Sequence, residues 1–285
     1  MLFLGACSEE FQPRQQEVER EAVILAELEV GKLVELQITS TFDRFSPTDQ
    51  PIFPTQEDLG PANVPFLSNL SPNGPRDVSM RYQTESQTWV PNQFLFNAGE
   101  PLSLSADLSV IGLENSFAET TPPIPGEIST HSDVAIDTGD NLEFSIELTL
   151  PESEESFYHI KPFIAESANS AIKEYFNFDL STPGESGLFV PSHIDGILID
   201  IDRTDNMRQF DFTIDKSELS SNPSNIYLQV RTVAKEYYDF HVSVTLQEEA
   251  GQLPFDEPFV IESNIEGGQG LFTAFTVTLD SIQVE

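Results

Sequence analysis

Basic residues are scarce in this chain of 285 residues. Only 13 Lys and Arg stand against 48 Asp and Glu, which gives a formal net charge of −35. Affinity for DNA or RNA comes largely from basic side chains that neutralise phosphates, and the few basic residues here form no cluster. We therefore expect no nucleic-acid partner, and anionic lipid head groups are disfavoured for the same reason.

Long apolar runs and cysteine pairs are missing as well. No segment reaches the roughly 18–20 apolar residues of a membrane-spanning helix. Cys7 is the single cysteine, so an intramolecular disulfide is excluded and stability must come from packing. The 22 Phe and six Tyr, together with aliphatic residues in alternating runs, supply the burial that disordered chains lack. The chain is therefore expected to be globular.

The first seven residues form an apolar run that ends in small residues at Cys7. This segment, residues 1–7, resembles a bacterial lipobox, with six residues before the cysteine and none of them basic. We expect it to be a truncated lipoprotein signal whose start lies upstream of Met1. The resemblance implies that Cys7 becomes the mature N-terminus and carries acyl chains, which anchor a protein stably when several are present. The alternative is a buried or free thiol in a cytosolic protein.

The residues after Cys7 point to the outer face of a cell. Ser8, Glu9, Glu10 and Phe11 resemble the short acidic signal that sends Bacteroidota lipoproteins through the outer membrane to the cell surface. An ordinary acidic linker is the alternative. Residues 8–21 are predicted to be an acidic tether, so the expected location is the outer membrane, lipid-anchored and facing the exterior.

Residues 22–128 are predicted to form an N-terminal β-sandwich domain. Ala22–Val30 and Leu33–Thr41 flank a Gly-Lys turn and are expected to pair as a hairpin. Seven prolines within 46–75 remove too many backbone donors for a central strand or helix, so this segment is predicted to be a long loop that covers the fold or serves a function. The proline-rich run Pro122–Gly126 is expected to mark the domain boundary.

Residues 129–285 are predicted to form a second β-sandwich. Apolar and polar residues alternate there with the period of half-buried strands. These runs are Leu142–Leu150, Ile197–Ile201, Phe210–Ile214, Ile226–Val230 and Leu271–Leu279. One helix is expected at about 235–250, where Tyr237 and His241 share a helical stripe. The predicted fold class is mainly β: two Ig-like β-sandwich domains with one helix near the C-terminus.

Patterns typical of enzymes are sparse. The four histidines have no metal-ligand spacing and are expected to be ordinary surface or core residues: His131, His159, His193 and His241. With 48 acidic residues, chance pairs of carboxylates are certain to occur, so their abundance weakens any glycosidase signal. We predict that the protein is not an enzyme and has no cofactor, and keep a surface hydrolase with paired carboxylates as an alternative.

Calcium is the one metal for which the sequence offers candidate ligands: Asp200, Asp202, Asp205 and Asp211. Three of them fall at positions 1, 3 and 12 of an EF-hand-like spacing, but Asp205 stands where that loop has glycine, and the flanks resemble strands. The cluster is therefore either a calcium site of another type or a solvated acidic hairpin.

Two further features allow a structural and a functional interpretation. Tyr82, Trp89, Phe94 and Phe96 are expected in the core, although exposed rings could stack on sugars or anchor a protein interface. The glycine-rich segment Asn264–Gly270 is expected to be a turn before the last strand, with a ligand-binding loop as the alternative.

Several of these segments together resemble a known family. They are the lipobox, the 22–41 hairpin, Phe117–Pro125 and the closing segments Glu236–Phe240, Pro254–Pro258 and Ser263–Phe272. In combination they are similar to the Bacteroidota family known as domain-of-unknown-function family 4249. The resemblance implies an outer-membrane lipoprotein of two β-rich domains, encoded beside TonB-dependent transporters and without an established activity.

The expected function follows from this location at the outer membrane. We expect a surface-exposed, non-enzymatic accessory or binding subunit of an outer-membrane β-barrel, with a TonB-dependent transporter as the partner. A long loop and exposed strand edges are standard docking surfaces. A free-standing module that binds glycan or calcium is the alternative. The sequence indicates no residues that would bind the ligand.

Overall fold

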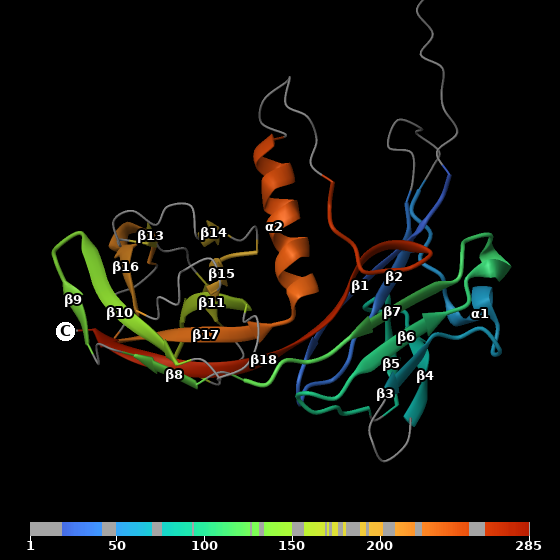
Figure 1. Cartoon of the computed structure of the whole chain (residues 1–285), viewed down its shortest axis with the longest axis horizontal. Helices are drawn as coiled ribbons and strands as arrows, with labels where there is room; N and C mark the ends of the chain where they lie inside the picture. The colour runs from blue at the N-terminus through green and yellow to red at the C-terminus, as the bar shows by residue number, and fades with distance from the viewer. Residues whose placement is uncertain are drawn as a thin grey trace, which may run out of the picture.

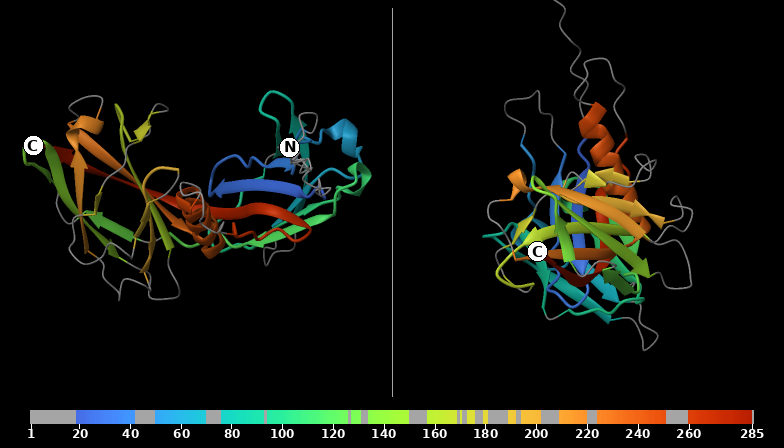
Figure 2. Two further views of the ribbon diagram at one scale, coloured as in Figure 1. Left: turned by 90° about the horizontal axis from the view of Figure 1, so that it is seen from above. Right: turned by 90° about the vertical axis from the view of Figure 1, so that its left-hand side faces the viewer.

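The computed structural model shows a mainly β protein with one long helix near its C-terminus (Figure 1). It describes residues 19–41, 50–69, 76–92, 94–125, 127–130, 134–149, 157–168, 170, 173–175, 179–180, 189–191, 194–201, 209–219, 224–250 and 260–284. The strands form two lobes that lie side by side and are joined by one long strand, β18 (Gly268–Val284) (Figure 2). The predicted mainly β fold class with a helix near the C-terminus is confirmed.

The N-lobe consists of two β layers. One is a five-stranded antiparallel sheet with strand order β5-β4-β3-β6-β7. Its strands are β3 (Phe66–Asn69), β4 (Arg76–Gln83), β5 (Thr88–Pro91), β6 (Leu102–Ala106) and β7 (Ser116–Thr120). The other layer contains β1 (Ala22–Glu29), β2 (Gln37–Ser40) and the beginning of β18. Apolar side chains of both layers, such as Ile24 and Leu104, share one buried core.

The C-lobe is built from the rest of a 13-stranded sheet whose main order is β13-β16-β10-β9-β18-β17-β11-β15-β14. Its strands are β8 (Glu127–Thr130), β9 (Val134–Asp137), β10 (Asn141–Thr149), β11 (Phe157–Ile164), β12 (Glu174–Tyr175), β13 (Asp179–Leu180), β14 (Phe189–Pro191), β15 (Ile197–Asp200), β16 (Gln209–Asp215) and β17 (Asn225–Val233). The sheet curves over a core that brings Leu142 and Phe212 together with Ile160 and Leu228. Each of these residues belongs to a run with the expected alternation or lies on a buried strand.

Helix α2 (Lys235–Ala250) stands over the sheet where the two lobes meet (Figure 1). Its buried face contains Tyr237, Tyr238 and His241, which pack toward Phe157 and Phe275. Three further helical segments that lie wholly within the described residues are a single turn each: α1 (Gln56–Leu59), η1 (Ser109–Ile111) and η3 (Lys216–Glu218). Within the described residues, no helix combines the length and the apolar character needed to cross a membrane.

The last strand crosses from one lobe to the other, which differs from the predicted division into 22–128 and 129–285. The first half of β18 pairs in parallel with β1, from Ala22–Gly268 to Glu29–Phe275, and the second half pairs with β17. Ile265, Phe272 and Ala274 accordingly belong to the N-lobe core. A strand of 17 residues is about 55 Å long, enough to serve two cores in succession.

The prediction of an irregular loop at 46–75 is wrong for two parts of that segment. β3 lies in the middle of the five-stranded sheet, and Thr55 begins α1 with a reciprocal capping box to Asp58. The prolines flank these short elements and do not interrupt them, so Phe66–Asn69 keeps its backbone donors. The prediction also placed the second hairpin strand too early, because Leu36 exchanges backbone hydrogen bonds with Trp89 and β2 begins only at Gln37.

The segment Asn264–Gly270 has a structural role: it turns at Gly267, as the sequence favoured, but β18 already begins at Gly268. The Asn264 side chain donates a hydrogen bond to the backbone oxygen of Phe272 at 2.7 Å and accepts one from its backbone N–H at 2.9 Å. Gly270 has a φ of +115°, and a Cβ at this position would lie 2.0 Å from the carbonyl oxygen of Ile24. Glycine is required here because β1 and β18 approach closely at a positive φ.

Candidate functional site

A polar cluster lies between α2 and the sheet at the junction of the two lobes. We call it the waist cluster: Glu27, His159, Lys161, Tyr175, Asp195, Arg231, Tyr237 and His241. Strand alternation places His159 and Lys161 on one face of β11, and Arg231 faces His159 from the neighbouring strand β17. Tyr237 and His241 are four residues apart on α2 and therefore share a helix face. The cluster thus joins residues from five elements and one loop, and from both lobes.

A directed chain of hydrogen bonds runs through the buried centre of the cluster. Arg231 Nη1 donates to the Tyr237 hydroxyl at 2.9 Å, and that hydroxyl lies 2.7 Å from His159 Nδ1. His159 Nε2 lies 2.7 Å from the backbone oxygen of Asp195, which can only accept. Nε2 therefore carries the hydrogen, and Nδ1 accepts from Tyr237. Burial, and next the charge of Arg231, hold the pKa of His159 well below its usual value, so the ring is neutral.

An ion-pair group connects β1 to α2 and β17. Glu27 Oε1 lies 3.1 Å from His241 Nε2, and Glu27 Oε2 lies 3.6 Å from Arg231 Nη1. Burial works to raise the pKa of Glu27, but the hydrogen bond and charge of His241 and the charge of Arg231 outweigh it, so the pKa is lowered. The N-lobe strand is thereby held to the helix by charge as well as by packing.

Lys161 is the buried cation of the cluster, with only 7% of its surface exposed. Its ammonium lies 3.9 Å from Asp195 Oδ2 and 4.6 Å from the centre of the Tyr175 ring. Burial, and next the positive charge of Arg231, lower the pKa of Lys161 to about 8, against the opposing effect of Asp195 and Glu27. A buried group with a shifted pKa and named charged neighbours is a candidate for function.

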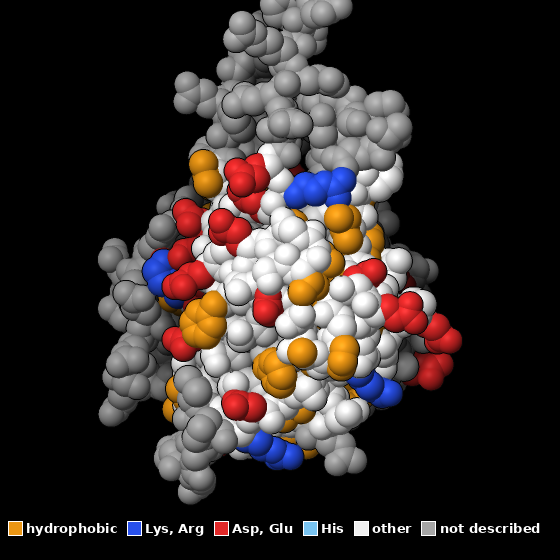
Figure 3. All heavy atoms as spheres, turned by 90° about the vertical axis from the view of Figure 1, so that its right-hand side faces the viewer, with side chains coloured by type: hydrophobic (Ala, Val, Ile, Leu, Met, Phe, Trp, Pro, Cys, Tyr) orange, Lys and Arg blue, Asp and Glu red, His pale blue; other side chains and the backbone are white. Residues whose placement is uncertain are grey.

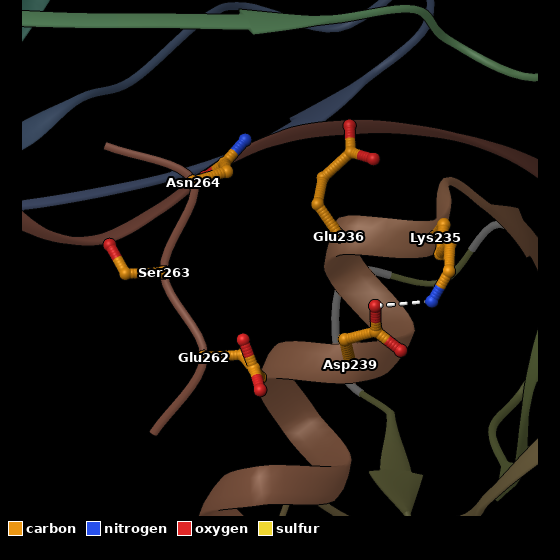
Figure 4. Close-up of a pocket in the computed structure, with 6 residues that line it drawn as sticks. All are labelled: Lys235, Glu236, Asp239, Glu262, Ser263 and Asn264. Atoms are coloured by element: carbon orange, nitrogen blue, oxygen red, sulfur yellow. Dashed lines mark hydrogen bonds and ion pairs between the residues drawn. The ribbon is translucent and has the colours of Figure 1, made fainter. Parts of the chain in front are cut away.

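A second feature is a pocket of about 240 Å³ at the N-terminal end of α2. Its walls are the first turns of the helix, with Lys235, Glu236 and Asp239, and the segment Glu262–Asn264 (Figure 4). Lys235 pairs with Asp239 at 2.6 Å, and the Thr120 hydroxyl donates to Glu236. Because carboxylates come from both walls, the pocket favours a cation or a hydroxyl group over an anion.

The residues predicted to carry the lipid and the export signal lie outside the described residues: Cys7, Ser8, Glu9, Glu10 and Phe11. Of the calcium candidates, Asp202 and Asp205 also lie outside them. Asp200 is buried at the end of β15, and Asp211 is exposed on β16, where it accepts a hydrogen bond from Ser145. Within the part of the chain that is described, no group of three or more His, Cys, Asp or Glu side chains could hold a metal ion.

The aromatic residues considered for ligand binding are core residues. Trp89, Phe94 and Phe96 are each at most 2% exposed. Tyr82 packs against Trp89 with 5.4 Å between ring centres. The structural interpretation of this group is therefore correct: Tyr82 and Trp89 lie on β4 and β5, Phe94 and Phe96 lie in the segment before β6, and all four pack into or against the N-lobe core.

Two of the histidines come together in a way that spacing did not indicate. The rings of His159 and His241 lie 6.4 Å apart, centre to centre, although 82 residues separate them in sequence. The Tyr237–His241 stripe on the predicted helix was the available signal for one half of the cluster. His131 and His193 lie outside the described residues.

These features define a mainly β, two-lobed protein with a buried polar junction beneath one helix. The chain belongs to the family described as Domain of unknown function (DUF4249), whose model matches residues 8–280. The match covers both lobes and includes every residue of the waist cluster. No protein with a curated description matches the chain.

Proposed function

We propose that the protein is a surface-exposed, lipid-anchored outer-membrane subunit that docks onto a β-barrel and has no enzymatic activity of its own. The partner we propose is a TonB-dependent transporter. The tether and Cys7 supply the attachment, and the two-lobed body supplies the docking surface. The support for the docking role comes from the surface of the N-lobe.

Among the described residues, the large hydrophobic side chains that are exposed lie mainly on the N-lobe. Seven of the nine such residues in the described chain belong to it: Leu25, Leu33, Phe66, Leu95, Val110, Phe117 and Ile124. The end of the molecule formed by this lobe shows hydrophobic side chains scattered among neutral, acidic and a few basic ones (Figure 3). Exposed apolar groups rimmed by polar residues are typical of surfaces that bind another protein. This distribution is the observation that carries the proposal.

The N-lobe is also the part nearest to the proposed anchor. Fourteen residues, 8–21, separate Cys7 from Ala22, the first residue of β1. Such a segment spans at most about 50 Å when fully extended. A lipidated Cys7 would therefore keep the apolar side chains of the N-lobe close to the membrane surface, where a β-barrel presents its outer loops.

Docking is tested with surface variants of the tagged full-length protein purified from native membranes in mild detergent. Leu33 and Leu95 are 81% and 63% exposed, so Leu33→Gln with Leu95→Gln should leave the fold unchanged. We expect several-fold less co-purified β-barrel than with the unmodified protein. Val260→Gln removes an equally exposed aliphatic side chain outside the N-lobe and should have no effect. Equal recovery of the barrel with all three proteins would contradict N-lobe docking.

Glycan binding is the second candidate function, and one surface row favours it. Phe66 and Phe117 are 40% and 38% exposed, and both face Ser105 across the register of β3, β6 and β7. The two rings are thus about 10 Å apart, two strand spacings, with a hydroxyl between them. Rings presented in this way can stack on sugars. Retention on a glycan array that is lost in Phe66→Ala with Phe117→Ala would support this candidate.

A further inference from the structure

The Lys161 ammonium is a buried charge that makes no hydrogen bond to any residue the structure describes. The side chain is 9% exposed, and its nearest carboxylate oxygen, Asp195 Oδ2, is 3.9 Å away, beyond hydrogen-bond range. Its other close neighbour is the ring of Tyr175, which attracts the cation but accepts no conventional hydrogen bond. An ammonium has three donors, and a buried charge without partners is costly. The site therefore lacks an acceptor.

Arg231 and Lys173 are two further basic residues near Lys161, and Asp195 and Glu27 are the carboxylates that face it. Arg231 lies on the adjacent strand, and its Nε is buried without a hydrogen-bond partner. Lys173 lies 4.4 Å above the ring of Phe163, which in turn contacts the ring of Tyr175 at 5.6 Å. Three of the 13 basic residues of the chain thus lie around the rings of Phe163 and Tyr175. Such a concentration opposes the repulsion that an anion meets elsewhere on this protein.

Two side chains next to the ammonium reach solvent. Asp195 has a side chain that is 51% exposed, and Tyr175 is half-buried. The Asp195 carboxylate would compete with an anionic ligand for Lys161. It is close enough to interact with the charge of the ammonium but too far away to accept a hydrogen bond from it.

We propose that Lys161, supported by Arg231 and Lys173, forms a binding site for the oxyanion group of a small ligand, a carboxylate or a sulfate or phosphate ester. Lys161 donates to the oxyanion, and the Tyr175 ring packs against the body of the ligand. This inference goes beyond the proposed docking function. It does not depend on the anchor or on a β-barrel partner, so either one can fail without the other.

The site is tested by calorimetric titration of the purified full-length chain with sulfate and with acetate at constant ionic strength. We expect saturable binding to a single site for at least one of the two anions. Lys161→Met should weaken this binding at least tenfold. Lys235→Met removes the same charge from an exposed lysine that pairs with Asp239, and it should bind as the unmodified chain does.

Asp195→Asn distinguishes a binding site from a merely structural lysine. Removing the competing carboxylate should strengthen anion binding several-fold, whereas loss of a structural ion pair would weaken or abolish it. This variant also keeps the proposal testable if Lys161→Met does not fold. The proposal is overturned if neither anion binds saturably to the unmodified chain and Asp195→Asn, or if Lys161→Met binds as tightly as the unmodified chain.

Affinity should also fall as the pH rises through about 8, where Lys161 loses its proton. The charged and titratable groups around it are Glu27 on β1, His159 on β11, Tyr175 on β12, Arg231 on β17, Tyr237 and His241 on α2, and Asp195. Burial raises the pKa of Tyr175 and Tyr237 above 10, and that of His159 lies well below 6.5. Among the groups with a shifted pKa, Lys161 is thus the one that titrates near pH 8, and constant affinity between pH 7 and 9 contradicts the site.

Discussion

His159 makes the stability of the protein depend on pH, because it is completely buried and its ring is held neutral. The unfolded chain binds a proton at this residue below a pH of about 6.5, whereas the folded chain resists it. The contribution of His159 is thus complete above pH 6.5 and is lost as the pH falls. We expect a loss of up to about 1.4 kcal/mol of unfolding free energy per pH unit, measured by urea denaturation at pH 7.5, 6.0 and 5.0.

The matched variant is His159→Gln, which keeps a donor and an acceptor but has no titrating ring. It should be less stable than the unmodified chain at pH 7.5, because the bonds to Tyr237 and to the Asp195 backbone are displaced. Its stability should also change less between pH 7.5 and 5. Equal slopes for the two proteins would contradict the neutral, buried state of His159.

Glu27 makes the stability of the fold depend on pH in a more acidic range than His159 does. Its pKa in the folded protein lies below the ordinary 4.5, so its ion pairs stabilise the fold above this value and are lost as the pH falls through the lowered pKa. Because 36% of the side chain is exposed, screening limits the effect. Glu27→Gln should cost about 1 kcal/mol at pH 7 in urea denaturation and about nothing at pH 3. An equal cost at both values would contradict the ion-pair role.

The residues of the waist cluster show how far sequence patterns reach. The sequence showed that Tyr237 and His241 share a helix face. It gave no alternating pattern for β11, because every position of that strand from Phe157 to Ile164 is buried. His159 and Tyr237 are 78 residues apart, and only the docking of α2 on β11 and β17 brings them to 2.7 Å. Local periodicity carries no information on such tertiary pairing.

At the scale of elements, the closest backbone approach is between β1 and β18. Gly270→Ala would place a Cβ 2.0 Å from the Ile24 carbonyl oxygen, at a φ of +115°. The two strands would have to separate along a parallel pair of eight residues. We expect a loss of about 3–5 kcal/mol of unfolding free energy, measured by chemical denaturation.

Gly112→Ala is the control for this prediction. Gly112 also has a positive φ, +78°, but a Cβ there would meet no atom within 4 Å. It should cost only about 1 kcal/mol, the penalty for a left-handed conformation. Similar losses for both variants would show that the close approach at Gly270 does not matter.

Strands could be predicted where apolar and polar residues alternate along them, because one face is then buried. Short strands that are stabilised by pairing with their neighbours could not be predicted. Phe144 and Phe212, from two predicted strands, face each other in the register of β10 and β16. In contrast, β3 has only four residues between proline-rich stretches and exists because β4 and β6 pair with it on both sides. Proline counting suggested a loop, since it ignores the positions at which the donors are needed.

At the scale of the molecule, the two lobes cannot be separated at residue 128. A chain of residues 19–128 lacks the parallel partner of β1 and three members of the N-lobe core, Ile265, Phe272 and Ala274. We expect this fragment to show no cooperative unfolding transition and little chemical-shift dispersion. Appending residues 262–275 through a flexible linker should restore both. Cooperative folding of the shorter fragment would contradict the shared role of β18.

The division into two units was visible from the proline-rich run near residue 122, but the return of the last strand was not. The parallel pair of β1 and β18 joins the two ends of the described chain. The alternation of apolar and polar residues in a strand shows which face is buried but not which strand it pairs with. The predicted domains were two consecutive stretches of sequence. Sequence patterns gave no reason to assign the start of the last strand to the N-lobe.

The central claim is that Cys7 anchors a subunit that docks onto an outer-membrane β-barrel. The most direct measurement is mass spectrometry of the N-terminal peptide and of co-purifying proteins after purification of the tagged full-length chain from native membranes, with Cys7→Ser as the control. We predict an acylated Cys7 and a stoichiometric β-barrel that is lost in the control. An unmodified chain in the soluble fraction would contradict the account.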